Sequence, residues 1–342
     1  MVHPEVVPTA ARRRFATFLV LATLFLIFAG AEVKSREAGL SVPDWPLSYG
    51  MVWPPMVGNV FYEHGHRAIA ATVGLLTVIL ATWISLTDPR SWVRKLGWWC
   101  VIGVCVQGLL GGLTVLFLLP EAISMSHGTL AQIFLCLVAW LALAHGAEWR
   151  QGRAGADRER ARGAFRAGVA AVAVIFVQLL LGAWVRHTEA GTAVPFFPVS
   201  PDGAWVPDFV NTQVVAHMIH RGFANVVAVL VLRMVWKAAR GLPWARVHAA
   251  GAALLLVVQV LLGAAIIWTL TDSIEGPVKA PVPTSLHVVN GAALLVTCWL
   301  LTLRAWRASQ PPITESAGAA ASGASEHLPR AAEEPALVGA DR

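Results

Sequence analysis

Eight stretches of about 20 mostly apolar residues run along the chain, and they restrict the possible folds more than any other feature. A helix rises ~1.5 Å per residue, so about 20 residues cross the ~30 Å hydrocarbon core of a bilayer. Only helices and closed barrels satisfy their backbone polar groups in lipid, and unbroken apolar runs of this length favour helices. The sequence therefore predicts an all-α integral membrane protein with transmembrane helices at residues 15–33, 66–87, 96–118, 126–147, 166–186, 217–236, 247–270 and 284–306.

The composition agrees with a membrane protein. Hydrophobic residues make up 56% of the chain and charged residues 13%, whereas soluble domains average about 25% charged residues. This excludes an ordinary cytosolic enzyme, a disordered chain and a nucleic-acid-binding protein. The four cysteines form no C-x-x-C spacing, which argues against a zinc ribbon, a thioredoxin-type site and covalently attached haem.

The net charge of +6 has a direct use in such a protein, because Lys and Arg gather on the cytoplasmic side of membrane helices. Apart from two arginines beside histidines, one set of connecting segments carries seventeen of these residues and the opposite set carries four. We therefore expect a multi-pass membrane protein with both termini cytoplasmic. Residues 1–14 are the predicted N-terminal segment, and the Ala-, Ser-, Glu- and Pro-rich residues 308–342 predict a disordered cytoplasmic tail.

The chain also repeats itself. Residues 30–46 align with residues 182–198 at a shift of 152, with nine identities in seventeen positions, and residues 106–112 align with residues 258–264 at the same shift. Four helices used twice in the same orientation predict a parallel repeat of two pseudo-symmetric four-helix bundles. The predicted organisation is a first half at 15–148, a basic cytoplasmic linker at 149–165 and a second half at 166–307.

Four histidines occupy matching places in this repeat, namely His66, His127, His220 and His287. Each lies at the predicted outer end of an even-numbered span, so each half supplies two histidines from two helices at one depth. This geometry can hold haem iron between two imidazole ligands. Hydrogen bonds to loop carbonyls or a proton relay would also use such histidines, whereas zinc is less favoured because neither half offers three close ligands at a familiar spacing.

The two halves differ beside these histidines. Glu63 lies three residues before His66 on the same helical face, whereas the matching position in the second half is His217. A carboxylate beside only one site suggests that the first half performs chemistry and the second holds a cofactor, although a carboxylate at a helix start also stabilises the helix dipole. Arg67 and Arg221 each follow a candidate ligand and would bind haem propionates or reach to the outer headgroups.

These motifs together resemble the haem A synthase family. The resemblance rests on the eight spans, the E-x-x-H-R element at 63–67, the H-R pair at 220–221, the lone histidines His127 and His287, and the sequence REAGLSVPDWP at 36–46. It implies a membrane oxidoreductase that oxidises the C8 methyl group of haem O to a formyl group, so that haem A becomes available to terminal oxidases.

The resemblance also implies a role for each matching residue. His66 and His127 would ligate or flank the substrate haem O, with Glu63 as the essential acidic residue beside them. His220 and His287 would be the axial ligands of a resident haem b. Oxidation of an unactivated methyl group agrees with this division, because haem iron supplies such chemistry and amino-acid side chains do not.

The resemblance covers roughly residues 15–307 and departs in one place. Many bacterial members carry a cysteine pair in the first outer loop, but here Val42 precedes Pro43 and residues 34–65 contain no cysteine. The implied partners are membrane lipid, a haem O synthase upstream and cytochrome oxidase assembly factors downstream, and the family is compatible with a homo-oligomer.

Two other classes of protein share some of these features. A di-haem b-type electron-transfer protein explains the four histidines equally well, but it explains neither the Glu63 and His217 asymmetry nor the sequence at 36–46. A transporter built on a parallel repeat would have charged residues or broken helices near the midplane, and the predicted spans have neither.

Overall fold

The computed structural model describes the following parts of the chain: residues 9–151, 157–199, 203–273, 276–278 and 280–310. Most of the predicted N-terminal segment, and the predicted tail from residue 311 onward, therefore lie outside the described residues.

Long helices dominate the described residues and confirm the predicted membrane-spanning fold. Eight of them are long and apolar enough to cross a bilayer. They are α1 (Thr9–Ser35), α2 (Asn59–Thr87), α3 (Ser91–Leu116), α4 (Glu121–Ala144), α6 (Arg158–His187), α7 (Thr212–Gly241), α8 (Arg246–Trp268) and α9 (Pro281–Ser309). The short elements are helix α5 (Ala147–Gln151), the 3₁₀ turns η1 (Ala190–Thr192) and η2 (Pro243–Ala245), and an antiparallel hairpin of β1 (Thr271–Ser273) and β2 (Gly276–Val278). This hairpin, which lies between α8 and α9, was not predicted.

Several helices begin earlier than the apolar stretches that predicted them. Helix α2 begins at Asn59 instead of 66, α4 at Glu121 instead of 126, and α7 at Thr212 instead of 217. The reason is that polar residues near each start interrupt the apolar run without interrupting the helix. The four candidate histidines therefore lie six to eight residues inside their helices, about 9 to 12 Å along the axis, and not at the helix ends as predicted.

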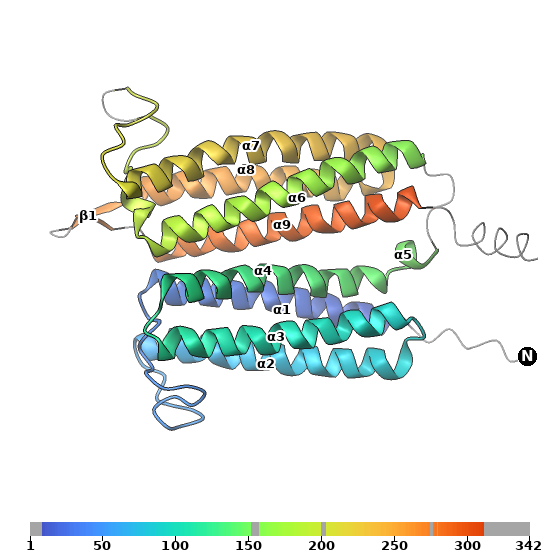
Figure 1. Cartoon of the computed structure of the whole chain (residues 1–342), viewed down its shortest axis with the longest axis horizontal. Helices are drawn as coiled ribbons and strands as arrows, with labels where there is room; N and C mark the ends of the chain where they lie inside the picture. The colour runs from blue at the N-terminus through green and yellow to red at the C-terminus, as the bar shows by residue number, and fades with distance from the viewer. Residues whose placement is uncertain (1–8, 152–156, 200–202, 274–275, 279, 311–342) are drawn as a thin grey trace, which may run out of the picture.

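Figure 1 shows the long helices in two groups, with α1 to α4 below and α6 to α9 above. Helices α4 and α9 face each other across the middle, α1 also packs against α9, and α4 packs against α6. The long loops and the hairpin gather at one end, and both termini leave at the other. Each group contains four consecutive long helices, as a duplicated four-helix unit would. The duplication itself stays a prediction.

Small residues allow close helix packing in the second group. The buried face of α6 carries an alanine about once per turn, at Ala161, Ala164, Ala167 and Ala171, and these residues belong to a core shared with α7 and α9. Small side chains let helix backbones approach closely, which is the main source of van der Waals attraction between helices in lipid. A separate cluster joins the two groups, with Leu135 and Ala139 of α4 against Ala292 and Val296 of α9.

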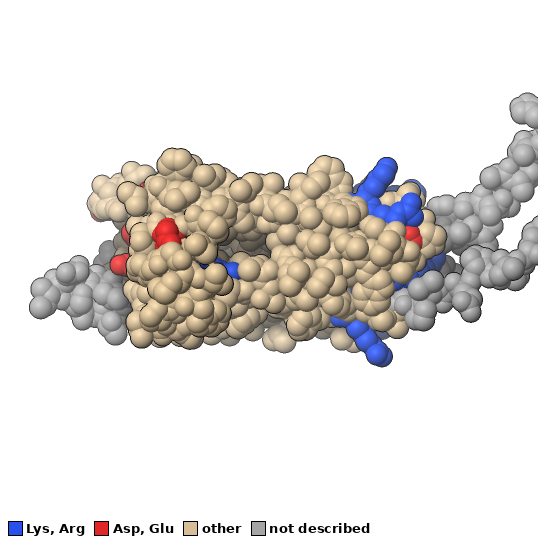
Figure 2. Space-filling view, turned by 90° about the horizontal axis from the view of Figure 1, so that it is seen from below, with Lys and Arg blue, Asp and Glu red and all other residues tan. Residues whose placement is uncertain are grey.

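Charged side chains gather at the two ends of the molecule. Figure 2 shows Lys and Arg concentrated at the end from which the terminal segments leave, with an uncharged band over the middle of the face in view. Such a band matches the part of a helical bundle that lipid tails surround. The assignment of the basic end to the cytoplasm stays a prediction.

Polar and aromatic contacts connect the two helix groups at both ends. At the loop end, Nη2 of Arg186 on α6 donates to the Ala31 carbonyl (2.6 Å) and to Oγ of Ser35 (2.9 Å), both on α1. At the other end, the rings of Trp140 on α4 and Trp299 on α9 lie 6.0 Å apart, centroid to centroid. The two groups are therefore held together over their whole length.

A buried ion cluster holds the basic end of the first group. Asp88, between α2 and α3, is 3% exposed. Its carboxylate accepts a hydrogen bond from Arg90 (2.7 Å) and lies 3.5 Å from Nη1 of Arg12 and 3.2 Å from Nε2 of His145. Burial alone would raise the pKa of Asp88, but the hydrogen bonds and charge of Arg90 outweigh it and lower this pKa to about 2. The cluster thus connects α1, the α2–α3 connection and the end of α4 through one carboxylate.

This cluster predicts acid-sensitive stability. The pKa of Asp88 is lower in the folded chain than in the unfolded chain. The ionised carboxylate therefore stabilises the folded chain fully above about pH 4, and this stabilisation is lost as the pH falls toward 2. Asp88→Asn should lower the free energy of unfolding by about 3 to 5 kcal/mol at neutral pH, because it leaves Arg12 buried without its counter-ion. The substitution should also make the stability of the folded chain less dependent on pH between about pH 4 and pH 2. Unfolding temperatures measured in detergent micelles from pH 7 to 2 test both effects, and parallel curves for the two proteins would contradict them.

Candidate functional site

All four candidate histidines lie against a glycine of the preceding long helix. The pairs are His66 with Gly30, His127 with Gly111, His220 with Gly182, and His287 with Gly263. A Cβ atom on any of these glycines would lie only 2.9 to 3.3 Å from Cε1 of the histidine ring. Each imidazole therefore occupies space that exists only because the facing residue has no side chain.

Glutamine side chains reach three of these histidines. Nε2 of Gln107 donates to the main-chain carbonyl of His127 (3.0 Å). Gln178 makes the same bond to the His220 carbonyl (2.9 Å), and Gln259 makes it to the His287 carbonyl (3.2 Å). Each glutamine lies four residues, or about one helical turn, before the glycine that faces the same histidine.

The histidine pair of the second group has the separation that a bis-imidazole haem requires. The ring centroids of His220 and His287 lie 6.4 Å apart, with an angle of 64° between the rings. Imidazole nitrogen binds a metal at about 2 Å, so two rings on opposite sides of one iron have centroids about 6 Å apart. Nδ1 of His287 is buried with no hydrogen-bond partner among the described residues. The residues present therefore fit a haem iron held from both sides.

The pair of the first group is arranged similarly. His66 and His127 lie close enough to interact electrostatically, and Nδ1 of His66 is buried without a hydrogen-bond partner in the described part of the chain. The residue that corresponds to the glutamines, four positions before Gly30, is Leu26. The first group therefore holds one of its two histidines with fewer hydrogen bonds than the second group does.

Glu63 is buried beside this first pair, with an exposed fraction of 3%. Its Oε1 accepts a hydrogen bond from Nη2 of Arg67 (2.6 Å), and its Oε2 accepts one from the main-chain N–H of Val42 (2.8 Å). The carboxylate is therefore fixed between its own helix and the first outer loop, one turn before His66. Glu63 is therefore not a solvated helix-start carboxylate, because it joins α2 to the first outer loop.

The two arginines that follow candidate ligands hold the outer loops. Arg67 donates to the carbonyls of Asp44 (2.7 Å), Leu47 (3.0 Å) and Val42 (3.1 Å). These bonds fasten the loop between α1 and α2 over the histidine end of α2. Contact of Arg67 with a haem propionate stays a prediction, but loop anchoring was not expected from the sequence.

Arg221 has the same arrangement in the second group. It donates to the carbonyls of Phe196 (2.8 Å) and Val194 (3.0 Å), and its Nε lies 3.1 Å from Nε2 of His217. His217 thus takes the place that Glu63 has beside Arg67. The predicted asymmetry between the halves therefore appears as a difference in the partner of an otherwise similar arginine.

The first outer loop also covers α3 next to His127. The ring of Trp45 lies so close to Gly112 that a Cβ on this glycine would be 2.6 Å from the indole. Within the same loop, Oγ of Ser48 lies 2.8 Å from Nδ1 of His64, whose side chain is buried. His64 therefore packs beneath this loop.

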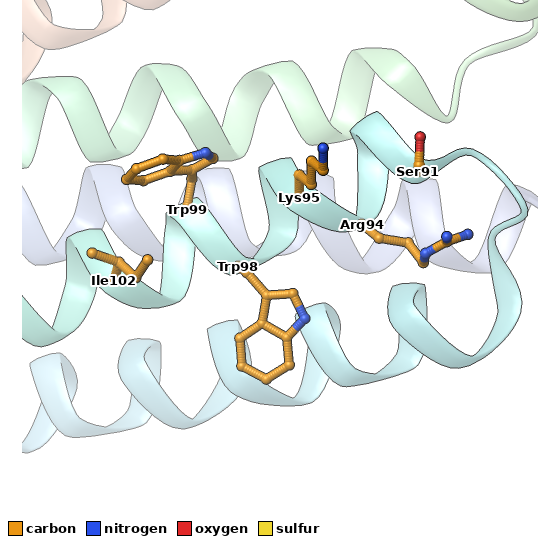
Figure 3. Close-up of a pocket in the computed structure, with 6 residues that line it drawn as sticks. All are labelled: Ser91, Arg94, Lys95, Trp98, Trp99 and Ile102. Atoms are coloured by element: carbon orange, nitrogen blue, oxygen red, sulfur yellow. The ribbon is translucent and has the colours of Figure 1, made fainter.

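An open surface hollow lies elsewhere. It encloses about 440 Å³ along one side of α3 and is lined by Ser91, Arg94, Lys95, Trp98, Trp99 and Ile102. Figure 3 shows that all six side chains project from this single helix. Ile102 is nine residues from Gly111, about 13 Å along the helix, so the hollow is separate from the histidine site.

Comparison with known proteins identifies the family of the chain. Residues 57–298 match the family model of cytochrome oxidase assembly proteins, COX15-CtaA. The chain belongs to this family. The matched region includes all four histidines, Glu63 and both arginines.

Curated relatives in this family are named haem A synthases. The protein of Shouchella clausii is 30% identical, over 75% of this chain and 87% of its own length. That of Symbiobacterium thermophilum is 30% identical over 64% of this chain and 72% of its own length. That of Hyphomonas neptunium is 25% identical over 91% of this chain and 97% of its own length.

Proposed function

We propose that this chain is a haem A synthase that oxidises the C8 methyl group of haem O to a formyl group. The observation that carries the proposal is the presence of two unequal histidine pairs in a member of this family. A buried carboxylate adjoins one pair, whereas a histidine has its place beside the other. A protein with two equivalent electron-transfer haems has no need of this difference, so the di-haem alternative is not favoured.

The first group, at residues 15–148, is the proposed substrate half. His66 and His127 would bind the iron of haem O or lie against its two faces. Glu63 is held by Arg67 and by the Val42 N–H, so its carboxylate stays in one position beside the bound substrate. Trp45 and the rest of the first outer loop cover this end and restrict the access of water.

The second group, at residues 166–307, is the proposed cofactor half. His220 and His287 would be the axial ligands of a resident haem b, and their 6.4 Å separation supports this assignment. Such a haem supplies a one-electron redox centre for electrons that leave the substrate. The glycine and the glutamine behind each ring hold the two imidazoles beside each other.

The remaining assignments follow from the same proposal. We infer that the two halves arose as a parallel repeat, joined by the basic segment at 149–165, and that the basic end lies in the cytoplasm of a bacterial cell. The haem sites would then lie toward the outer face of the inner membrane. A haem O synthase would supply the substrate, and cytochrome oxidase assembly factors would receive the product.

Expression in bacterial membranes that make haem O, but lack their own haem A synthase, tests the proposed function. We expect extracted haems to include haem A, separated and identified by chromatography and mass spectrometry. Membranes with an empty vector provide the baseline. If haem O accumulates while neither hydroxylated nor formylated haem appears, the proposal is wrong.

A further inference from the structure

Three of the four histidines share a contact that the fourth lacks. Gln107, Gln178 and Gln259 each donate a side-chain hydrogen bond to the main-chain carbonyl of a histidine on the next long helix. The equivalent residue opposite His66 is Leu26. Leucine has no donor, so this bond cannot form between α1 and α2.

The glutamine amides also lie against the histidine rings, and Nε2 of Gln259 lies 3.1 Å from Nε2 of His287, whose Nδ1 has no partner among the described residues. Nε2 of Gln107 lies 3.2 Å from Nδ1 and 3.3 Å from Nε2 of His127, and the two distances from Gln178 to His220 are 3.2 and 3.4 Å. A donor nearly equidistant from both nitrogens lies over the ring face, away from either lone pair. The amide therefore holds the backbone and covers one ring face, while a ring nitrogen stays free for iron.

At His66 the residue on α1 offers a main-chain bond but no side-chain donor. Leu26 packs with the apolar core of the first group, and its main-chain carbonyl is a hydrogen-bond partner of the His66 ring. Gly30 makes the closest of the four glycine approaches, with a Cβ position 2.9 Å from Cε1. His66 therefore sits in a tight space but lacks the side-chain hydrogen bond that joins neighbouring helices at the other three sites.

We infer that Leu26 makes His66 the releasable axial ligand of the first half. His127 holds the substrate haem firmly, the bond from His66 nitrogen to iron opens and closes, and both ligands of the second half stay fixed. The inference rests on the proposed function and deepens it, because an enzyme must exchange its substrate haem but keep its cofactor haem. Leu26 acts through His66 and is a positioning residue.

Carbon monoxide provides the probe, because it binds ferrous haem only where an axial ligand leaves the iron. The purified full-length chain, loaded with both haems and reduced with dithionite, is mixed rapidly with carbon monoxide and followed by absorbance. In the wild-type chain we expect only the first-half haem to react. In Leu26→Gln the reaction should slow by about 3- to 10-fold, the range expected for one added interhelical hydrogen bond.

Two further variants keep the test independent of how well Leu26→Gln folds. Gln178→Leu, the matched change in the second half, should make the haem b reactive toward carbon monoxide. Leu26→Met, which adds no donor, should keep the wild-type rate. Equal rates in the wild-type chain and Leu26→Gln, or an unreactive haem b in Gln178→Leu, would overturn the inference.

A different measurement, the formation of haem A, tests the proposed function. It depends on the appearance of haem A in membranes, whereas the carbon monoxide rate depends only on bound haem. A chain that makes haem A but shows no effect of these variants disproves the role of Leu26 alone. A wild-type chain that binds no haem in its first half disproves both.

Discussion

Glu63→Gln is expected to reduce the formation of haem A by at least about 100-fold, the lower range for loss of a positioned acid–base group. The substitution keeps the size of the side chain but removes the charge that now faces Arg67 at 2.6 Å. Haem b should remain bound, because the change lies in the first group and His220 and His287 are untouched. The measurement is chromatography of haems extracted from membranes, with the reduced optical spectrum for haem b.

The second half offers a matched control for this substitution. His217 occupies the corresponding place beside Arg221, so His217→Gln changes an equivalent position without altering a carboxylate. We expect it to leave haem A formation within a few-fold of the wild-type level. Glu63→Asp keeps the charge but draws the carboxylate back from Val42, and it should retain part of the activity. If Glu63→Gln makes haem A at the wild-type rate, the carboxylate has no part in the reaction.

Loss of haem b is the second large effect expected. His220→Ala and His287→Ala should each lower haem b content by more than about 10-fold, because each removes one of the two iron ligands in the second group. His66→Ala and His127→Ala should retain haem b while losing product. Haem content per chain is measured from the reduced pyridine complex of the purified protein.

This comparison separates two explanations of the four histidines. If all four alanine variants lose haem b equally, the histidines support the fold as a whole and the division into substrate and cofactor halves is wrong. Thermal unfolding of the same samples distinguishes local loss of a ligand from loss of the fold, because a folded chain without haem b still unfolds cooperatively.

The membrane fold could be predicted from the sequence because its cause is length and hydrophobicity, which every apolar run displays directly. The helix ends could not. Helix α2 includes Glu63 and His64 in its second turn, and both residues lower the local hydropathy although their side chains are buried by the first outer loop. A hydropathy pattern therefore stops where polar residues begin, even where loop contacts allow the helix to continue.

The candidate histidines were found because the repeat places them twice, but their supporting residues were not. Gln107 and Gln259 resemble packing residues in an apolar run, and their acceptors are main-chain carbonyls, which a sequence does not distinguish. The bonds of Arg67 to the first outer loop could not be predicted either, because their acceptors are also main-chain carbonyls. Asp88 was missed because its partners Arg12 and His145 lie far from it along the chain.

The common level of the four histidines has an electrical consequence. Each lies six to eight residues inside a helix that begins at the loop end of the molecule, so all four lie at a similar distance from that end. An electron passing between the two sites would move parallel to the membrane plane and do almost no work against the transmembrane voltage. Electron transfer between the halves should therefore be insensitive to the transmembrane voltage.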